Sequence, residues 1–156
     1  MAIERRIVQF RFDELAEVVA EFDRISKTDD GKEWVTISPW VDPEHLPVVS
    51  LLRRMFSGRG SKVPEVTWVP AQAGEPAQLG VLHATGPQAL DRLRERGVTP
   101  PATWRKIGDH SKRGLLFALH PGTASIDAVR FALDAARALA EVPTDERWIA
   151  EVSSAR

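Results

Sequence analysis

The sequence predicts an α+β protein built as a two-layer sandwich, with helices packed on one face of a β-sheet. Two observations favour this class. Short stretches rich in β-branched and aromatic residues alternate with longer helical segments along the whole chain. The apolar residues of the helical segments recur every three to four positions, which is typical of a helix that buries one side.

The first part of the chain predicts a strand, a helix and a second strand. Residues 3–12 hold β-branched and aromatic side chains and form the first strand. Asp13 stands at the N-cap position of a helix that is expected to end near residue 27. The apolar positions of that helix share one face and are Leu15, Val18, Val19, Phe22 and Ile25. Residues 34–41 form the second strand, which Pro39 interrupts.

The next segment predicts one more helix and one more strand. Pro47 lacks the N–H that a continuing helix needs, so we expect a short turn at 43–46 and a separate helix over 47–56. The glycine-rich and basic segment 57–62 indicates a flexible loop, and its spacing does not match a phosphate-binding P-loop. Residues 63–69 form the third strand.

The rest of the chain gives the clearest pattern. We expect a strand at 79–84, a helix that ends at Gly97, strands at 103–108 and 114–120, a helix at 126–142 and a strand at 147–152. Gly97 is placed where a left-handed residue commonly ends a helix. The resulting order, βαββαβ, is that of a ferredoxin-like unit, which places its first and third strands side by side.

Small and turn-forming residues at 70–77 mark a boundary between two halves. The N-terminal half is residues 1–76, with the order βαβαβ, and the C-terminal half is residues 77–156. The halves either share one sheet, as one integrated domain, or pack their sheets together. Both C-terminal helices cover one face of the sheet, so the N-terminal half or a second subunit should cover the other. We therefore expect a homo-oligomer.

Composition narrows the chemistry that the protein can perform. The chain of 156 residues has no cysteine, which excludes disulfides, thiolate metal sites and thiol nucleophiles. Hydrophobic residues make up 43% and no apolar run approaches the roughly 20 residues of a membrane span. The N-terminal segment MAIERRIVQFRF carries charges and lacks a cleavage site for a secretory signal. We expect a cytoplasmic protein with no membrane partner.

Two histidines fall at matching places in the C-terminal half. His83 and His120 each follow a predicted central strand and precede a helix, and we expect the two strand ends to lie at the same edge of the sheet. Two imidazoles beside two helix N-termini would suit a small anionic ligand or proton transfer, with hydroxyls from Thr85 and Thr123. The structural alternative is that each histidine only hydrogen-bonds the backbone at its strand end.

A second group of polar residues lies in the loop between the strands at 103–108 and 114–120. Asp109 and His110 are adjacent and are secondary candidates for acid–base chemistry, with Lys112 and Arg113 as candidate ligand-binding cations. A polar hairpin tip has the same composition. Two histidines with no suitably spaced third ligand fall short of a zinc site, so neither a metal nor a cofactor is predicted.

Charge is unevenly distributed along the chain. Residues 53–113 carry 11 basic and 5 acidic side chains within a chain whose net charge is −1. This basic segment is the argument for a nucleic-acid partner. The isoelectric point of about 6.4 is low for such a partner, and the strand-like run RGLLFALH has one aromatic residue where an RNA-binding sheet carries several. Nucleic acid is therefore an unlikely partner by sequence.

No motif identifies a reaction, and three hypotheses follow. The first is a self-associating binding or interaction module with a small anionic ligand at the His83 and His120 cleft. The second is a small cofactor-independent enzyme that uses these histidines for acid–base chemistry. The third is a nucleic-acid binder that uses residues 53–113. The five tryptophans are expected to be core or interface anchors, or walls of a pocket for a planar ligand.

Overall fold

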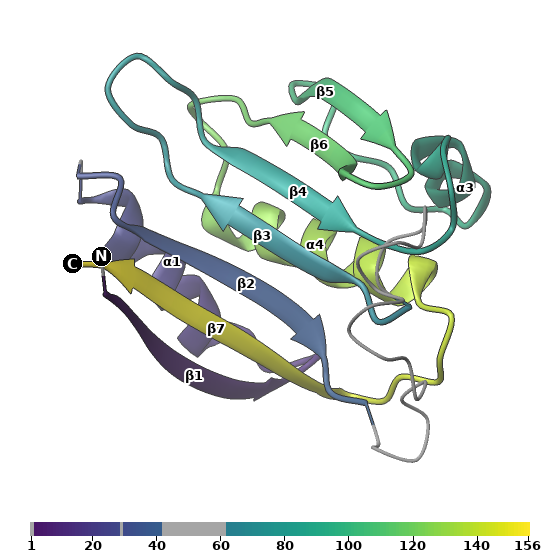
Figure 1. Cartoon of the computed structure of the whole chain (residues 1–156), viewed down its shortest axis with the longest axis horizontal. Helices are drawn as coiled ribbons and strands as arrows, with labels where there is room; N and C mark the ends of the chain where they lie inside the picture. Colours follow the sequence, from purple (N-terminus) through teal and green to yellow (C-terminus); the bar gives the residue numbers. More distant parts are fainter. Residues whose placement is uncertain (1, 29, 42–61) are drawn as a thin grey trace.

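The computed structural model describes residues 2–28, 30–41 and 62–156. In this part of the chain, three helices pack on one seven-stranded antiparallel sheet (Figure 1). The strands are β1 (Ile3–Arg11), β2 (Glu33–Pro39), β3 (Glu65–Val69), β4 (Gln78–Leu82), β5 (Arg105–His110), β6 (Gly114–Ala118) and β7 (Arg147–Ala155). The helices are α1 (Ala16–Ser26), α3 (Ala89–Glu95) and α4 (Ser125–Leu139). The predicted α+β class is confirmed.

The strand order across the sheet is β1-β7-β2-β3-β4-β6-β5. Each neighbouring pair is antiparallel, and β2–β3, β3–β4 and β5–β6 are consecutive in sequence. The first and last strands pair along nine residues, from Ile3 opposite Ala155 to Arg11 opposite Arg147. The two termini of the chain therefore lie side by side at one end of the sheet (Figure 1).

The ferredoxin-like arrangement of the C-terminal unit is not confirmed. Strands β4, β6 and β5 are neighbours, so the predicted first and third strands do lie side by side. The other side of β4 pairs with β3, and β7 lies between β1 and β2. Strands β3 and β4 form a hairpin through the loop at 70–77, so β3 occupies the side of β4 where a ferredoxin-like unit would hold β7.

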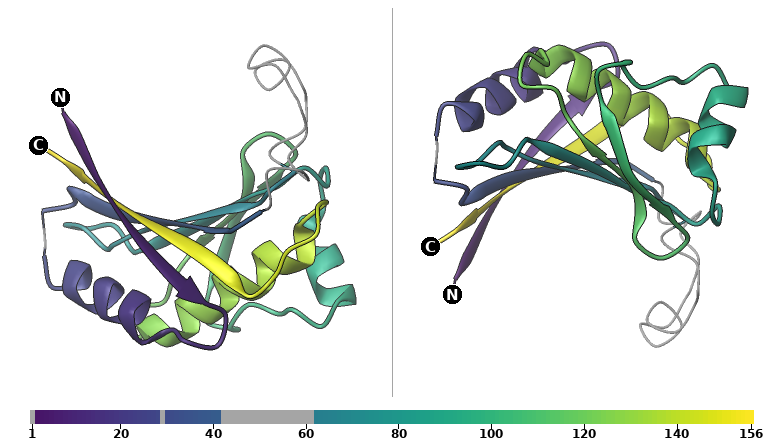
Figure 2. Two further views of the ribbon diagram at one scale, coloured as in Figure 1. Left: turned by 90° about the horizontal axis from the view of Figure 1, so that it is seen from below. Right: turned by 90° about the horizontal axis from the view of Figure 1, so that it is seen from above.

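The core lies between the sheet and the layer formed by α1 and α4, which occupy the same side of it (Figure 2). Helix α4 approaches the sheet closely because several of its buried residues are small, namely Ala128, Ala132, Ala135 and Ala136. Three aromatic rings from β6, α4 and the segment before β5 pack together, namely Phe117, Phe131 and Trp104. Burying a large apolar side chain in such a layer contributes roughly 1.5–3 kcal/mol.

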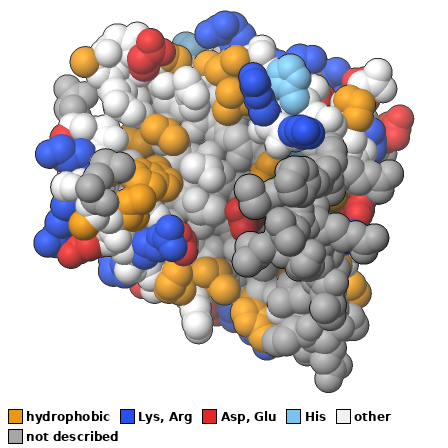
Figure 3. Space-filling model, viewed as in Figure 1, with side chains coloured by type: hydrophobic (Ala, Val, Ile, Leu, Met, Phe, Trp, Pro, Cys, Tyr) orange, Lys and Arg blue, Asp and Glu red, His pale blue; other side chains and the backbone are white. Residues whose placement is uncertain are grey.

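The other face of the sheet carries no helix among the described residues (Figure 2). Figure 3 looks onto this face and shows hydrophobic side chains among polar and charged ones. At its centre, the hydroxyls of Thr36 and Thr67 on neighbouring strands lie 3.2 Å apart. Helix α1 of the N-terminal half packs on the same side as α4, so it does not supply the cover that the sequence led us to expect.

Most predicted elements that fall within the described residues are found close to their predicted bounds. Helix α3 ends before Gly97, which has a φ of +77° as the predicted left-handed cap requires. The turn at 43–46, the helix at 47–56 and all but the last residue of the loop at 57–62 lie outside the described residues. No helix in the described segments has both the length and the apolar character needed to cross a membrane.

Candidate functional site

The structure places His83 and His120 at opposite ends of two adjacent strands, β4 and β6, so the predicted cleft between them was wrong. Strands β4 and β6 are adjacent but antiparallel, with Gln78 opposite Ala118 and Val81 opposite Leu115. The crossover through α3 makes β5 run in the direction of β4, and the β5–β6 hairpin then reverses it. Five-residue strands therefore separate the two histidines by about 16 Å or more.

His83 is fully buried just beyond the end of β4. Its Nδ1 atom accepts hydrogen bonds from the Thr85 backbone N–H (3.2 Å) and lies 2.9 Å from the Thr85 hydroxyl. Its Nε2 atom is buried without a hydrogen-bond partner among the described residues. Burial lowers the pKa of His83 below its ordinary value of 6.5, and the carboxylate of Asp109 offsets only part of that effect.

The predicted loop residues lie at the same end of the strands as His83. Asp109 accepts hydrogen bonds from the backbone N–H groups of Ala89 (3.0 Å) and Leu90 (3.1 Å), so its carboxylate caps the first turn of α3. The remaining candidates are exposed at the hairpin and are His110, Lys112 and Arg113. Six of the eight predicted site residues thus gather at this end of the strands.

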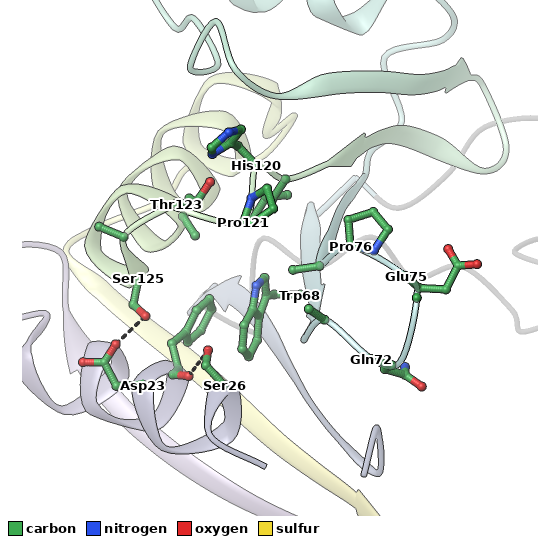
Figure 4. Close-up of a pocket in the computed structure, with 17 residues that line it drawn as sticks. Asp23, Ser26, Trp68, Gln72, Glu75, Pro76, His120, Pro121, Thr123 and Ser125 are labelled. Carbon is green, nitrogen blue, oxygen red and sulfur yellow. Dashed lines mark hydrogen bonds between the residues drawn. The ribbon is translucent and has the colours of Figure 1, made fainter. Parts of the chain in front are cut away.

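His120 and Thr123 lie at the opposite end of the strands and line a pocket of about 710 Å³ (Figure 4). Four parts of the chain form its walls: the second half of α1, the end of β3, the loop between β3 and β4, and the segment that leads from β6 into α4. The pocket is therefore assembled from elements that are far apart in sequence. We take this pocket, rather than the predicted cleft, as the candidate functional site.

Two aromatic rings form one wall of the pocket. Phe22 of α1 and Trp68 of β3 are stacked, with ring centroids 4.3 Å apart and planes inclined by 20°. Both side chains are almost completely buried by their surroundings, so their positions are fixed by packing. Small residues across the pocket leave the space open and are Ala71, Gly74, Ala77, Ala124 and Ala128. Little of either ring is exposed, so this wall offers an apolar surface to an apolar part of a ligand.

The donors of the pocket come from the segment between β6 and α4. The Nδ1 atom of His120 accepts a hydrogen bond from the Gly122 backbone N–H (3.1 Å), which in the neutral ring leaves an N–H at Nε2. The Thr123 hydroxyl oxygen accepts a hydrogen bond from the Trp104 indole N–H (3.2 Å), so its own hydrogen is free to donate. Figure 4 shows His120 and Thr123 on this side of the pocket.

The acceptors of the pocket include two carboxylates. Asp23 of α1 accepts a hydrogen bond of 2.5 Å from the hydroxyl of Ser125, the first residue of α4. Glu75 lies in the loop between β3 and β4, which is closed by backbone hydrogen bonds between Gln72 and Glu75. Among the described residues that line the pocket there is no lysine or arginine, so the carboxylates give it a negative charge.

Sequence reasoning missed most of this site. The sequence predicts Phe22 on the buried face of a helix and the loop at 70–77 only as a boundary. It gives Trp68, with the other tryptophans, as a core or interface anchor or as a wall of a pocket. The available signal was the run of small residues in that loop directly after a strand that carries a tryptophan. The partners Asp23 and Ser125 are 102 positions apart, and no local pattern connects them.

The contacts among the described residues add no support for metal binding or for nucleic-acid binding. In residues 2–28, 30–41 and 62–156, no three His, Asp or Glu side chains are grouped closely enough to hold a metal ion. Within the basic segment, Arg92 donates hydrogen bonds to the carbonyls of Gly86 (2.7 Å) and Pro87 (2.6 Å), and Arg94 pairs with Asp91. The nucleic-acid hypothesis stays a prediction.

Comparison with known proteins gives no family for this chain: no protein-family model, no curated protein and no solved structure matches it. Its function has to be inferred from the geometry of the pocket.

Proposed function

We propose that the protein is a non-enzymatic binding protein whose ligand is a small molecule with a flat apolar body and a protonated amino group. The observation that carries this proposal is the pocket of about 710 Å³, which joins the stacked pair Phe22 and Trp68 to the carboxylates Asp23 and Glu75. Its volume lies within the roughly 300–1,000 Å³ that is usual for small-molecule sites.

The charge of the pocket supports a cation over the anion that the sequence suggested. The N-terminus of α4 attracts negative charge. The carboxylate of Asp23, which accepts a hydrogen bond from the hydroxyl of Ser125 at the start of α4, already provides that charge. A bound anion would also lie beside the unpaired charge of Glu75, since no ion pair of Glu75 occurs among the described residues. A ligand ammonium group would instead gain charge-assisted hydrogen bonds from these carboxylates.

The hydrogen bonds within the pocket favour binding over catalysis. The Nδ1 atom of His120 binds the backbone N–H of Gly122, and Asp23 binds the hydroxyl of Ser125. The two side chains therefore do not hydrogen-bond each other, as a catalytic base and the carboxylate that orients it would. The free N–H of His120 and the hydroxyl of Thr123 are suited to hold a polar substituent of the ligand. The alternative that the sequence offers is a cofactor-independent enzyme that uses His83 and His120 for acid–base chemistry.

Three indole compounds that differ only in charge test the proposal. Tryptamine is a cation, indole-3-acetate is an anion and 3-methylindole is neutral, and each offers the same ring to Trp68. By titration calorimetry we expect tryptamine to bind at least about tenfold more tightly than indole-3-acetate, a difference of about 1.4 kcal/mol. Tighter binding of indole-3-acetate would support the anionic ligand instead, and no binding of any of the three would refute the proposed pocket.

Asp23→Asn is the matched variant for the charge argument. The amide keeps the shape of the side chain and an oxygen that accepts the Ser125 hydrogen bond, so the fold should persist. We expect tryptamine affinity to fall by about tenfold while that of 3-methylindole stays unchanged. Glu95→Gln, an exposed position at the end of α3, is the control and should leave both affinities unchanged.

A further inference from the structure

Strand β1 forms a regular edge of the sheet. In the described part of the chain it pairs only with β7, and the register is continuous over nine residues. The opposite edge strand, β5, has a shift in register between Lys106 and Gly108. Such irregularities protect sheet edges against pairing with other strands, and β1 has none.

The hydrogen bonds at both ends of β1 show which backbone groups point outward. The carbonyl of Ala2 accepts from the Arg156 N–H (3.0 Å), and the N–H of Phe12 donates to the Glu146 carbonyl (2.8 Å). Because backbone groups of successive residues alternate in direction, the even-numbered residues face β7. The odd-numbered residues face outward. The outward carbonyl of Arg11 already accepts from the Glu14 N–H (3.0 Å), which leaves Ile3, Arg5, Ile7 and Gln9.

The charged side chains of β1 do not prevent pairing, because the chain itself supplies their counter-charges. Arg5 lies 3.5 Å from the Glu151 carboxylate, Arg6 lies 2.7 Å from that of Glu21, and Arg11 pairs with Glu146. The most exposed large hydrophobic side chain of the described residues is Ile7, at 52%. The middle of this edge therefore combines an exposed isoleucine with backbone donors and acceptors that have no partner among the described residues.

We propose that β1 pairs with β1 of a second copy of the chain, antiparallel and centred on Ile7. In this register Ile7 meets its counterpart across the two-fold axis, Arg5 lies opposite Gln9 of the second copy, and Arg6 lies opposite Val8. The free backbone groups of three residues on each strand then form hydrogen bonds. The two sheets become one continuous sheet.

Like charges exclude the neighbouring registers. A centre at Arg5 places that residue opposite its own copy, and a centre at Arg6 does the same for Arg6. A centre at Val8 places Arg5 opposite Arg11 on both sides of the axis. Like charges directly opposite in an antiparallel pair are unfavourable. Of the registers centred on residues 5 to 8, only the one centred on Ile7 avoids such pairs. A centre at Gln9 would place Ile7 opposite Arg11, whose outward carbonyl already accepts from the Glu14 N–H.

Cysteine substitution tests both the surface and the register, because the natural chain has no cysteine. Residues opposite each other in a hydrogen-bonded pair have Cα atoms about 5.5 Å apart, within the range of a disulfide. We expect Ile7→Cys to form a covalent dimer on mild oxidation. Ile107→Cys is the matched control, since Ile107 is the comparably exposed isoleucine, at 44%, of the other edge strand. Equal cross-linking of the two variants would overturn the proposal.

Sedimentation equilibrium on the unmodified chain measures the same association without a cross-link. A contact between two single strands is at the small end of specific interfaces, so we expect a dimer with a dissociation constant of about 10–100 µM. Gln9→Glu places a carboxylate opposite Arg5 of the second copy and should tighten the dimer several-fold, and Gln9→Lys should weaken it. A strict monomer at all concentrations, or no response to either substitution, would contradict the proposal.

Discussion

Gly114 shows how a single residue without a side chain is required by the packing of two strands. Its φ is +79°, and a Cβ atom at this position would lie 2.1 Å from the backbone carbonyl oxygen of Val81. Backbone cannot move aside as the end of a flexible side chain can. The turn between β5 and β6 therefore needs both the left-handed conformation and the close approach to β4 that glycine allows.

Gly114→Ala is expected to lower the free energy of unfolding by about 3 kcal/mol or more, because the clash adds to the cost of the left-handed conformation. Gly97→Ala is the matched control. Gly97 has nearly the same φ, +77°, but a Cβ there would meet nothing within 4 Å, so its loss should be about 1 kcal/mol. Urea unfolding of both variants measures the difference, and equal losses would show that only the backbone conformation matters.

His83 links the stability of the protein to pH. Burial lowers its pKa in the folded chain, so the folded chain stays unprotonated where the unfolded chain already binds a proton near pH 6.5. The unfolded state then binds more protons, and the free energy of unfolding falls as the pH drops below about 6.5. Above that value His83 is neutral in both states, so it no longer changes the free energy of unfolding with pH.

His83→Gln should therefore flatten the fall in stability between about pH 7 and pH 5, since glutamine does not titrate and can still accept the hydrogen bond from Thr85. His110→Gln, which makes the same substitution at an exposed histidine, is the control. Thermal unfolding at a series of pH values measures both slopes. If both variants retain the natural slope, His83 is not the group responsible.

At the scale of elements, helix α3 depends on a residue that belongs to another element. The residue before it, Gln88, has a φ of +65° and gives no side-chain cap. Asp109 of β5, about twenty positions later, accepts the N–H groups of both Ala89 and Leu90. The carboxylate therefore fixes the position of α3 relative to the β5–β6 hairpin, which explains Asp109 without a catalytic role.

Asp109→Ala should destabilise the chain by about 1–2 kcal/mol, because two N–H groups at the start of α3 lose their acceptor. Asp91→Ala removes another carboxylate in the first turn of the same helix, but that side chain is 67% exposed and should cost less than about 0.5 kcal/mol. Unfolding in denaturant compares the two variants. A larger loss for Asp91→Ala would show that charge near the helix dipole matters more than the cap.

An ion-pair network shows the same dependence between elements on the other side of the molecule. Glu21 of α1 contacts Arg6 of β1 (2.7 Å) and Arg24 of its own helix (3.0 Å), and Arg24 also contacts Glu33 of β2 (2.9 Å). Burial by itself would raise the pKa of Glu21, but the hydrogen bonds from the two arginines outweigh it and lower the pKa. These contacts fix α1 over β1 and β2.

At the scale of the whole molecule, one sheet joins the two predicted halves, since β7 pairs with β1 and β2. The sheet face that carries no described helix and the edge of β1 that has no described partner strand are separate features. The proposed dimer uses the edge and leaves the face as it is in Figure 3. The pocket beside α1 and α4 lies on the other, helix-bearing side, so ligand binding and self-association can be tested independently.

The sequence by itself determined the α+β class, the approximate bounds of the elements and the cap at Gly97, because these depend on local periodicity and backbone preferences. It could not determine that β7 pairs with β1 and β2. The antiparallel direction of β4 and β6 is implied by the predicted order of a crossover helix and a hairpin, but the expectation for His83 and His120 overlooked it. The antiparallel pairing of β4 and β6 separated His83 from His120, and the contact of α1 with α4 brought Asp23 to Ser125. Only the tertiary structure decided the contact of α1 with α4 and the place of β7, since both depend on which surfaces pack together across about a hundred residues of chain.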